Sequence, residues 1–213
     1  MKSMFTVVLS VLLLTPIAAA DDVREIEESF DIKGEQTLRI DFPVGELRIE
    51  GSGGNKVEAE FIIRCRWGAG DCEEALEGLH LKTRSSDSRL NLELDGFPKW
   101  HKKWLQTEGV IRMPKRNALD LDMGVGELEI EGLGSDLRVD IGVGEASLRL
   151  PEKKFETISL DVGVGEAELF GAHDRVAGRR SMLVGSEIYW NEGKGSSRVK
   201  VDIGVGEITV WLE

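Results

Sequence analysis

The sequence predicts an all-β protein, specifically a β-solenoid of the single-stranded β-helix type with coils of about 20 residues, N-terminal strands and one short helix. Three observations support this fold. A glycine-rich motif recurs at a nearly constant spacing, apolar and polar residues alternate on both sides of each copy, and the glycines flank a valine where a strand could turn a corner.

The repeated motif has the form Asp-x-Gly-Val-Gly-Glu. Complete copies begin at Asp122, Asp140, Asp161 and Asp202, an early variant spans Asp41 to Glu46, and a degraded copy spans Leu183 to Glu187. Five of the central valines are Val125, Val143, Val164, Val184 and Val205, separated by 18, 21, 20 and 21 residues. A period of this length is typical of a solenoid coil.

Each copy lies between two segments with the period-two alternation of a half-buried strand. Before one corner Val139 and Ile141 alternate with charged residues, and after it Ala146 and Leu148 alternate with polar ones. We expect the valine between them to point inward, so that successive valines form an internal column. The alternative is a meander of hairpins, with Ile141 opposite Ala146 and the valine at an exposed tip. A valine in all six copies favours the solenoid.

Residues 21–117 are less regular than residues 118–213. Strands are predicted at 25–32, 37–42, 46–50, 57–66, 79–84, 89–94 and 109–113, with a helix from Asp71, its N-cap, to Leu79. This part is either a set of irregular coils or a capping β layer. We therefore expect residues 21–213 to form a single domain.

Residues 1–20 have the pattern of a secretory signal peptide, with Lys2 before an apolar run and small residues at 18–20. The protein is expected to be exported, to the periplasm or the extracellular space. The net charge of −12 argues against nucleic acid as a partner, because phosphate binding needs an excess of Lys and Arg. In an oxidising compartment Cys65 and Cys72 should form a disulfide that closes a short loop.

The segments LDMGVGELEIEGL, VDIGVGEASLRL and LDVGVGEAELFG resemble the toast-rack family of bacterial proteins, which is related to adhesin-like β-solenoid domains found in envelope-stress operons. The resemblance covers most of the mature chain and is strongest over residues 118–213. It implies an exported or envelope-associated β-solenoid without established catalysis. The Gly-Val-Gly-Glu corner differs from the Gly-Ser-Gly-Asp form common among the adhesin-like relatives.

In a solenoid the acidic residues of the motif would stack in outward columns, with strands about 4.8 Å apart. Two such charges repel by about 0.9 kcal/mol in bulk water. Solvation, bonds to backbone N–H groups, or a bridging calcium ion could relieve this repulsion. The candidate metal ligands are Asp122, Glu127, Asp140, Glu145, Asp161 and Glu166. If calcium binds them, millimolar calcium should raise the melting temperature, and a chelator should reverse the effect.

These patterns favour a non-catalytic envelope module with a structural, adhesive or ligand-binding role. The alternative is a glycan-binding or glycan-cleaving protein that uses its outward carboxylates. An enzyme is disfavoured, because every coil offers the same pair of carboxylates and an active site needs partners that differ in protonation.

Two further features indicate partners. A basic, aromatic loop could contact anionic lipid or a glycan, or its tryptophans could instead fold back onto the protein. This loop consists of Lys99, Trp100, His101, Lys102, Lys103 and Trp104. The chain also ends directly after the last repeat, so an open C-terminal coil is expected, and self-association through it is a hypothesis.

Overall fold

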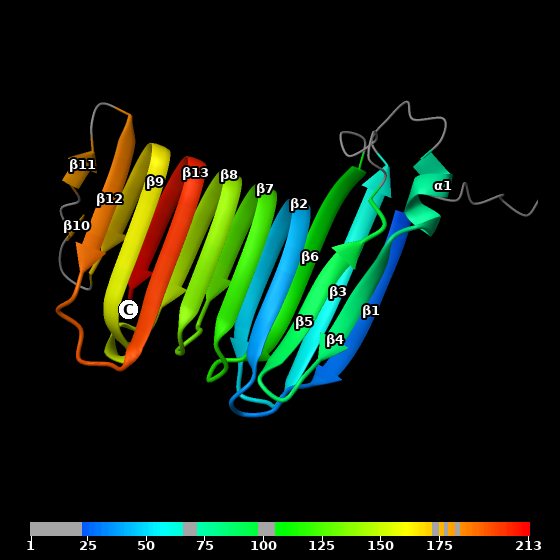
Figure 1. Ribbon diagram of the computed structural model, residues 1–213, viewed down its shortest axis with the longest axis horizontal. Helices are drawn as coiled ribbons and strands as arrows, with labels where there is room; N and C mark the ends of the chain where they lie inside the picture. The colour runs from blue at the N-terminus through cyan, green and yellow to red at the C-terminus, as the bar shows by residue number, and fades with distance from the viewer. Residues whose placement is uncertain (1–22, 66–71, 98–104, 172–174, 177–178, 182–183) are drawn as a thin grey trace, which may run out of the picture.

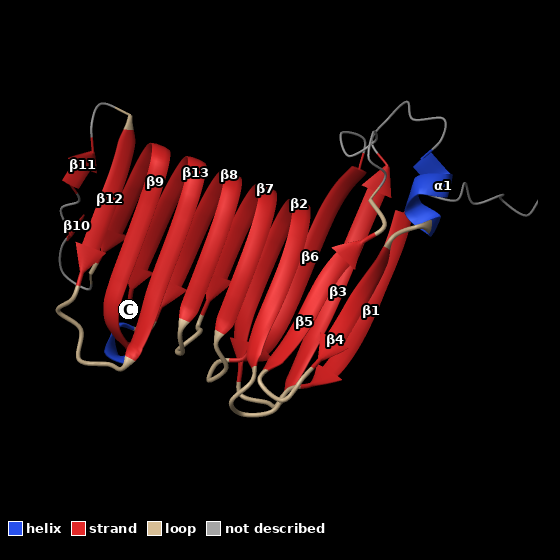
Figure 2. Cartoon of the chain, in the orientation of Figure 1, coloured by secondary structure: helices blue, strands red, loops and turns tan. Residues whose placement is uncertain are grey.

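The computed structural model describes residues 23–65, 72–97, 105–171, 175–176, 179–181 and 184–213. Nearly all of this part of the chain forms β-strands, and its thirteen strands belong to one sheet (Figure 2). The described ranges also contain the short helix α1 (Cys72–Glu77) and a 3-10 turn at Glu152–Lys154. None of the described helices is long and apolar enough to cross a bilayer. The predicted signal peptide lies outside the described residues.

Five long strands carry the motif and stack in parallel. They are β2 (Thr37–Ser52), β7 (Leu119–Glu131), β8 (Leu137–Leu150), β9 (Phe155–Phe170) and β13 (Ser197–Leu212), in the spatial order β2-β7-β8-β13-β9. Each strand folds over at its corner, so that the limbs before and after the corner lie in two facing layers (Figure 1). The corners line up along one edge of the molecule and the connecting loops along the opposite edge.

The core lies between the two layers, because both limbs of a strand turn their apolar residues inward. In β7, Leu121 and Met123 before the corner and Leu128 and Ile130 after it are all buried. Equivalent residues of the neighbouring strands join the same hydrophobic cluster. The alternation that predicted two half-buried segments therefore describes the two limbs of one folded strand.

Beyond β2 the two layers continue as separate sets of strands. The layer of the limbs before the corner adds β5 (Arg89–Asp95), parallel to β2, and then β4 (His80–Ser85). The other layer adds β6 (Leu105–Pro114), parallel to β2, followed by the antiparallel strands β3 (Lys56–Cys65) and β1 (Val23–Asp31). Residues 23–114 thus supply most of one end of the two-layer structure.

Beyond β9 the layers also separate. β12 (Gly185–Trp190) pairs antiparallel with the first limb of β9 and with β11 (Arg179–Ser181), while β10 (Arg175–Val176) pairs with the second limb. The sheet as a whole is therefore mixed, with a parallel centre and antiparallel strands at its ends.

Several topological predictions need correction. The hairpin alternative is wrong, because Ile141 is in register with Met123 and Ile203 on neighbouring parallel strands, not with Ala146. A simple order in which each coil stacks on the preceding one is also wrong, since β13 inserts between β8 and β9. The C-terminal strand consequently pairs on both sides, and the expected open C-terminal coil does not form.

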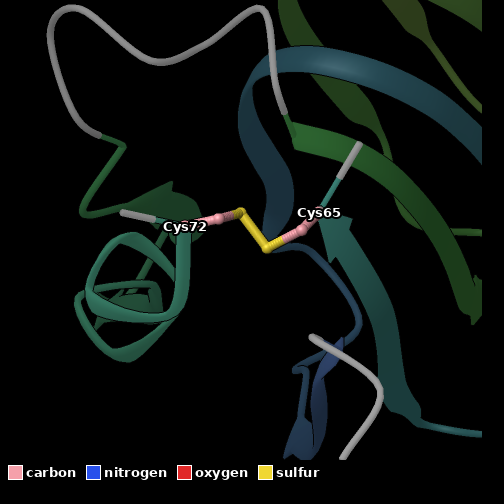
Figure 3. The surroundings of a disulfide bond; sticks show 2 residues. All are labelled: Cys65 and Cys72. Atoms are coloured by element: carbon pink, nitrogen blue, oxygen red, sulfur yellow. A yellow bond between two sulfur atoms is a disulfide. The ribbon is translucent and has the colours of Figure 1, made fainter. Parts of the chain in front are cut away.

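The predicted disulfide is present and joins the end of β3 to the start of α1 (Figure 3). The helix contacts β1 and β3, and its Leu76 is buried together with Leu79, which follows it. The disulfide therefore ties this small helix to the end of the layer formed by β6, β3 and β1.

Candidate functional site

The central valines form a row along the edge where the strands turn, and all of them except the half-buried Val44 are exposed. The register of the parallel strands places Val44, Val125, Val143, Val205 and Val164 side by side in that order. Val184 extends the row, because its carbonyl oxygen accepts a hydrogen bond of 2.8 Å from the amide of Gly165. Val184 reaches this position although β12 runs antiparallel to β9. We call these six residues the valine ridge.

The valine ridge faces solvent, so the prediction of an internal valine column is wrong. Val125, Val143, Val164 and Val205 are 46–49% exposed, and Val184 is 62% exposed. The cause is the conformation of the corner. The second glycine of each corner has a positive φ, +152° at Gly126 and +153° at Gly144, which carries the chain across the top of the core. The valine between the two glycines therefore lies outside the core.

A row of glutamates runs along one side of the valine ridge. The strand register aligns Glu108, Glu46, Glu127, Glu145, Glu207 and Glu166, which we call the Glu row. Glu207 lies between Glu145 and Glu166, not after them as the sequence order suggested. A groove of about 560 Å³ runs along this side, and Glu46, Glu127, Glu145 and Glu207 line it.

A second acidic row lies on the other side of the ridge. The register aligns Glu93, Asp41, Asp122, Asp140, Asp202, Asp161 and Glu187, which we call the Asp row. Glu187 belongs to this row, although the motif assigned it to the glutamates, because β12 runs in the opposite direction. Two residues that the motif did not include, Glu93 and Glu108, extend the rows onto neighbouring strands.

Basic side chains neutralise much of the Asp row. Arg39 on β2 binds Asp120, with an N–O distance of 2.6 Å, and also pairs with Asp122. In the next strands Arg138 pairs with Asp140 at 3.0 Å and Lys200 with Asp202 at 2.5 Å.

Next to one end of this row, Asp41 lies between two acidic neighbours, Glu93 and Asp122. Desolvation, together with the facing carboxylates of Glu93 and Asp122, raises the pKa of Asp41 despite the opposing effect of Arg39. The repulsion predicted from the motif is therefore present in the Asp row, and Arg39, Arg138 and Lys200 relieve part of it.

The Glu row has much less compensation. Arg64 pairs with Glu108 at its end, at 2.8 Å. No residue in the described part of the chain forms an ion pair with Glu127, Glu145 or Glu207. Arg48 and Arg149 are bound to carboxylates further from the corner, including Glu129. The middle of the Glu row therefore presents carboxylates that are open to a partner.

The predicted metal ligands divide between the two rows, on opposite sides of the valine ridge. Asp122, Asp140 and Asp161 lie in the Asp row, and Glu127, Glu145 and Glu166 in the Glu row. Across the residues that the structure describes, no three acidic, histidine or cysteine side chains are grouped so that they could hold a metal ion. Calcium binding stays a prediction. The basic loop at residues 99–104 lies outside the described residues.

Comparison with solved structures identifies similar folds. A putative cell adhesion protein from Clostridium sporogenes is 20% identical and has a TM-score of 0.52, with 89% of this chain and 100% of that chain covered. A putative adhesin from Bacteroides fragilis is 12% identical with a TM-score of 0.36, covering 88% of this chain and 97% of that chain. No protein-family model matches the chain, and no curated protein matches it in sequence. The first comparison shows that this chain shares its fold with the Clostridium sporogenes protein.

Proposed function

We propose that this protein is an exported, non-catalytic envelope module that binds its ligand along the edge formed by the valine ridge. The observation that carries the proposal is the row of six aligned valines, of which five are exposed and one, Val44, is half-buried. A contiguous exposed apolar surface with a polar rim is typical of an interaction site. Single exposed apolar residues would need no such explanation, but these form an unbroken row.

The location and the adhesive role are parts of the same proposal. The signal-like N-terminus and the disulfide support an oxidising compartment. An adhesive role agrees with the name of the Clostridium sporogenes protein that shares the fold. We further propose that residues 21–213 act as one domain, in which the parallel stack is a solenoid-like core completed by antiparallel strands. The uniform spacing of its carboxylates favours binding over catalysis.

The test is to measure binding of the mature chain to immobilised bacterial envelope fragments by surface plasmon resonance. We expect the wild type to bind and the triple variant Val125→Ser, Val143→Ser, Val205→Ser to bind at least about tenfold more weakly. The reason is that each valine contributes apolar area that the bound ligand would remove from water. Tyr189→Ser is the control, because Tyr189 is 64% exposed and lies outside the ridge. Equal binding by the triple variant, or no binding by the wild type, would refute the proposal.

A further inference from the structure

The valine ridge and the Glu row form two parallel lines with different chemistry. In every complete corner the valine and the glutamate are two residues apart, as in Val125 and Glu127, and the register repeats this pair on adjacent strands. The pairs recur about every 4.8 Å across the stack. A ligand that follows the edge would therefore meet an apolar line and an anionic line at the same time.

From this arrangement we infer that the edge binds an extended polypeptide in which basic and apolar residues alternate. In an extended chain successive side chains point to opposite sides. Such a ligand places its apolar side chains against the valine ridge and its Lys or Arg side chains against the Glu row. The inference rests on the proposed function and specifies the chemistry of its partner.

Charge complementarity favours a basic and apolar peptide over other possible ligands of this edge. Glu127, Glu145 and Glu207 have no ion-pair partner among the described residues, so an incoming cation does not have to displace an internal one. The side of the ridge formed by the Asp row differs, because Arg39, Arg138 and Lys200 already occupy it. The ligand's basic residues are therefore expected on the glutamate side.

The same charges disfavour a second copy and an anionic membrane. Two copies joined ridge to ridge would bring the Glu row of one chain close to an acidic row of the other. Like charges opposed across an interface cost several kcal/mol. An anionic lipid surface would meet the same repulsion. A neutral apolar partner would gain nothing from the aligned glutamates.

The experiment uses fluorescence anisotropy with three synthetic peptides of equal length and the mature full chain. One peptide alternates Lys and Leu, the second alternates Lys and Ser, and the third alternates Glu and Leu. We expect the Lys-Leu peptide to bind, with an affinity that falls as salt is raised, because exposed charges are screened. The Lys-Ser peptide should bind about tenfold more weakly, and the Glu-Leu peptide should not bind.

Two sets of variants test the contributions of the Glu row and the valine ridge separately. Glu127→Gln with Glu145→Gln and Glu207→Gln should weaken Lys-Leu binding about tenfold and flatten its salt dependence. The valine triple variant should weaken binding while leaving the salt dependence unchanged. The matched charge control is Glu25→Gln with Glu27→Gln and Glu28→Gln, three exposed residues of the edge strand β1, and it should retain wild-type affinity. Circular dichroism melts confirm that each variant is folded.

The outcomes separate this inference from the proposed function. If the glutamine variant binds Lys-Leu as the wild type does, or if the Lys-Leu and Glu-Leu peptides bind equally, the inferred partner is wrong. If the valine variant still loses envelope binding in that case, the proposed function stands with a different ligand. If envelope binding is also unaffected by the valine variant, both proposals fail.

Discussion

A β-carbon on Gly144 would lie 1.8 Å from the carbonyl oxygen of Gly126 on the neighbouring strand. Both glycines occupy the second position of their corners and have a positive φ. We expect Gly144→Ala to destabilise the protein by about 2–5 kcal/mol, since it combines backbone strain with overpacking against a rigid neighbour. Urea denaturation measures the loss.

Gly34 supplies the matched control for this substitution. It lies in an exposed turn, and a β-carbon there would meet nothing within 4 Å. Gly34→Ala should change the free energy of unfolding by less than about 1 kcal/mol, and it could increase stability by restricting the unfolded chain. Similar losses in the two variants would show that the close approach at the corners is unimportant.

The raised pKa of Asp41 predicts a pH dependence of stability. The folded chain retains a proton on Asp41 at pH values where the unfolded chain has lost it, so stability decreases as pH rises from the ordinary aspartate pKa through the raised value. Asp41→Asn removes this effect. We expect the variant to be about 0.5 kcal/mol or less more stable than the wild type at neutral pH, because exposed charges are partly screened. The gain should vanish below the ordinary pKa.

Asp95 should show the opposite behaviour and serves as a comparison. A hydrogen bond of 2.7 Å from the amide of Gly96 lowers the pKa of Asp95, and Lys82 adds to the effect. Its contribution to stability is present at neutral pH and is lost as pH falls through the lowered pKa. Asp95→Asn should therefore destabilise the protein at neutral pH. If the stability differences of the two variants from the wild type changed with pH in the same direction, both pKa shifts would be contradicted.

The disulfide should stabilise the fold mainly by restricting the unfolded chain. Cys65 and Cys72 are separated by 7 positions, and closing such a loop contributes about 2.5 kcal/mol in the chain-entropy model. Reduction with dithiothreitol should lower the melting temperature. It should also accelerate amide hydrogen exchange more in α1 than in the parallel stack. A double Cys→Ser variant should be insensitive to dithiothreitol. An unchanged melting temperature after complete reduction would refute the prediction.

Arg149, Trp211 and Phe170 form a row of flat groups on adjacent strands. The Arg149 guanidinium carbon lies 5.2 Å from the Trp211 ring centroid, and the Trp211 and Phe170 centroids are 6.1 Å apart. A double-mutant cycle of Arg149→Ala and Trp211→Ala should give a coupling energy of about 0.5–1 kcal/mol. The control cycle pairs Arg112→Ala with Trp211→Ala and should be additive within about 0.5 kcal/mol. Additivity in both cycles would mean that the cation–π contact contributes nothing.

Local pattern predicted the strands well, because alternation directly reflects which side of a strand is buried. It placed the two limbs around each corner, including those around Ile141, and the short helix after residue 70. The direction of the corner valines was not predictable from alternation. By alternation from Met123, Val125 should point inward, but the chain turns between Gly124 and Gly126 and Val125 is exposed. Alternation describes which side of a continuous strand is buried, so it does not extend across a corner.

The acidic rows were predictable in kind but not in order. The motif aligned Asp140 and Glu145 with their equivalents, and the register agrees. The insertion of β13 and the reversed direction of β12 depend on long-range pairing, so Glu207 and Glu187 were misplaced. The bases that neutralise the Asp row had a local signal: Arg39, Arg138 and Lys200 each stand two residues before a motif aspartate, on the same side of the strand.

The position of β13 has a consequence for how the parallel stack is completed. The last sixteen-residue strand of the chain fills the space between β8 and β9, and the turn at Glu152–Lys154 passes around its end, where the Glu152 amide donates to the Glu213 carbonyl at 2.9 Å. Without β13, β8 and β9 would each have an unpaired parallel edge. A chain truncated before β13 would keep both strand edges exposed, and exposed edges promote aggregation. Formation of β13 is therefore the step that joins β9 and its neighbours to the rest of the parallel stack.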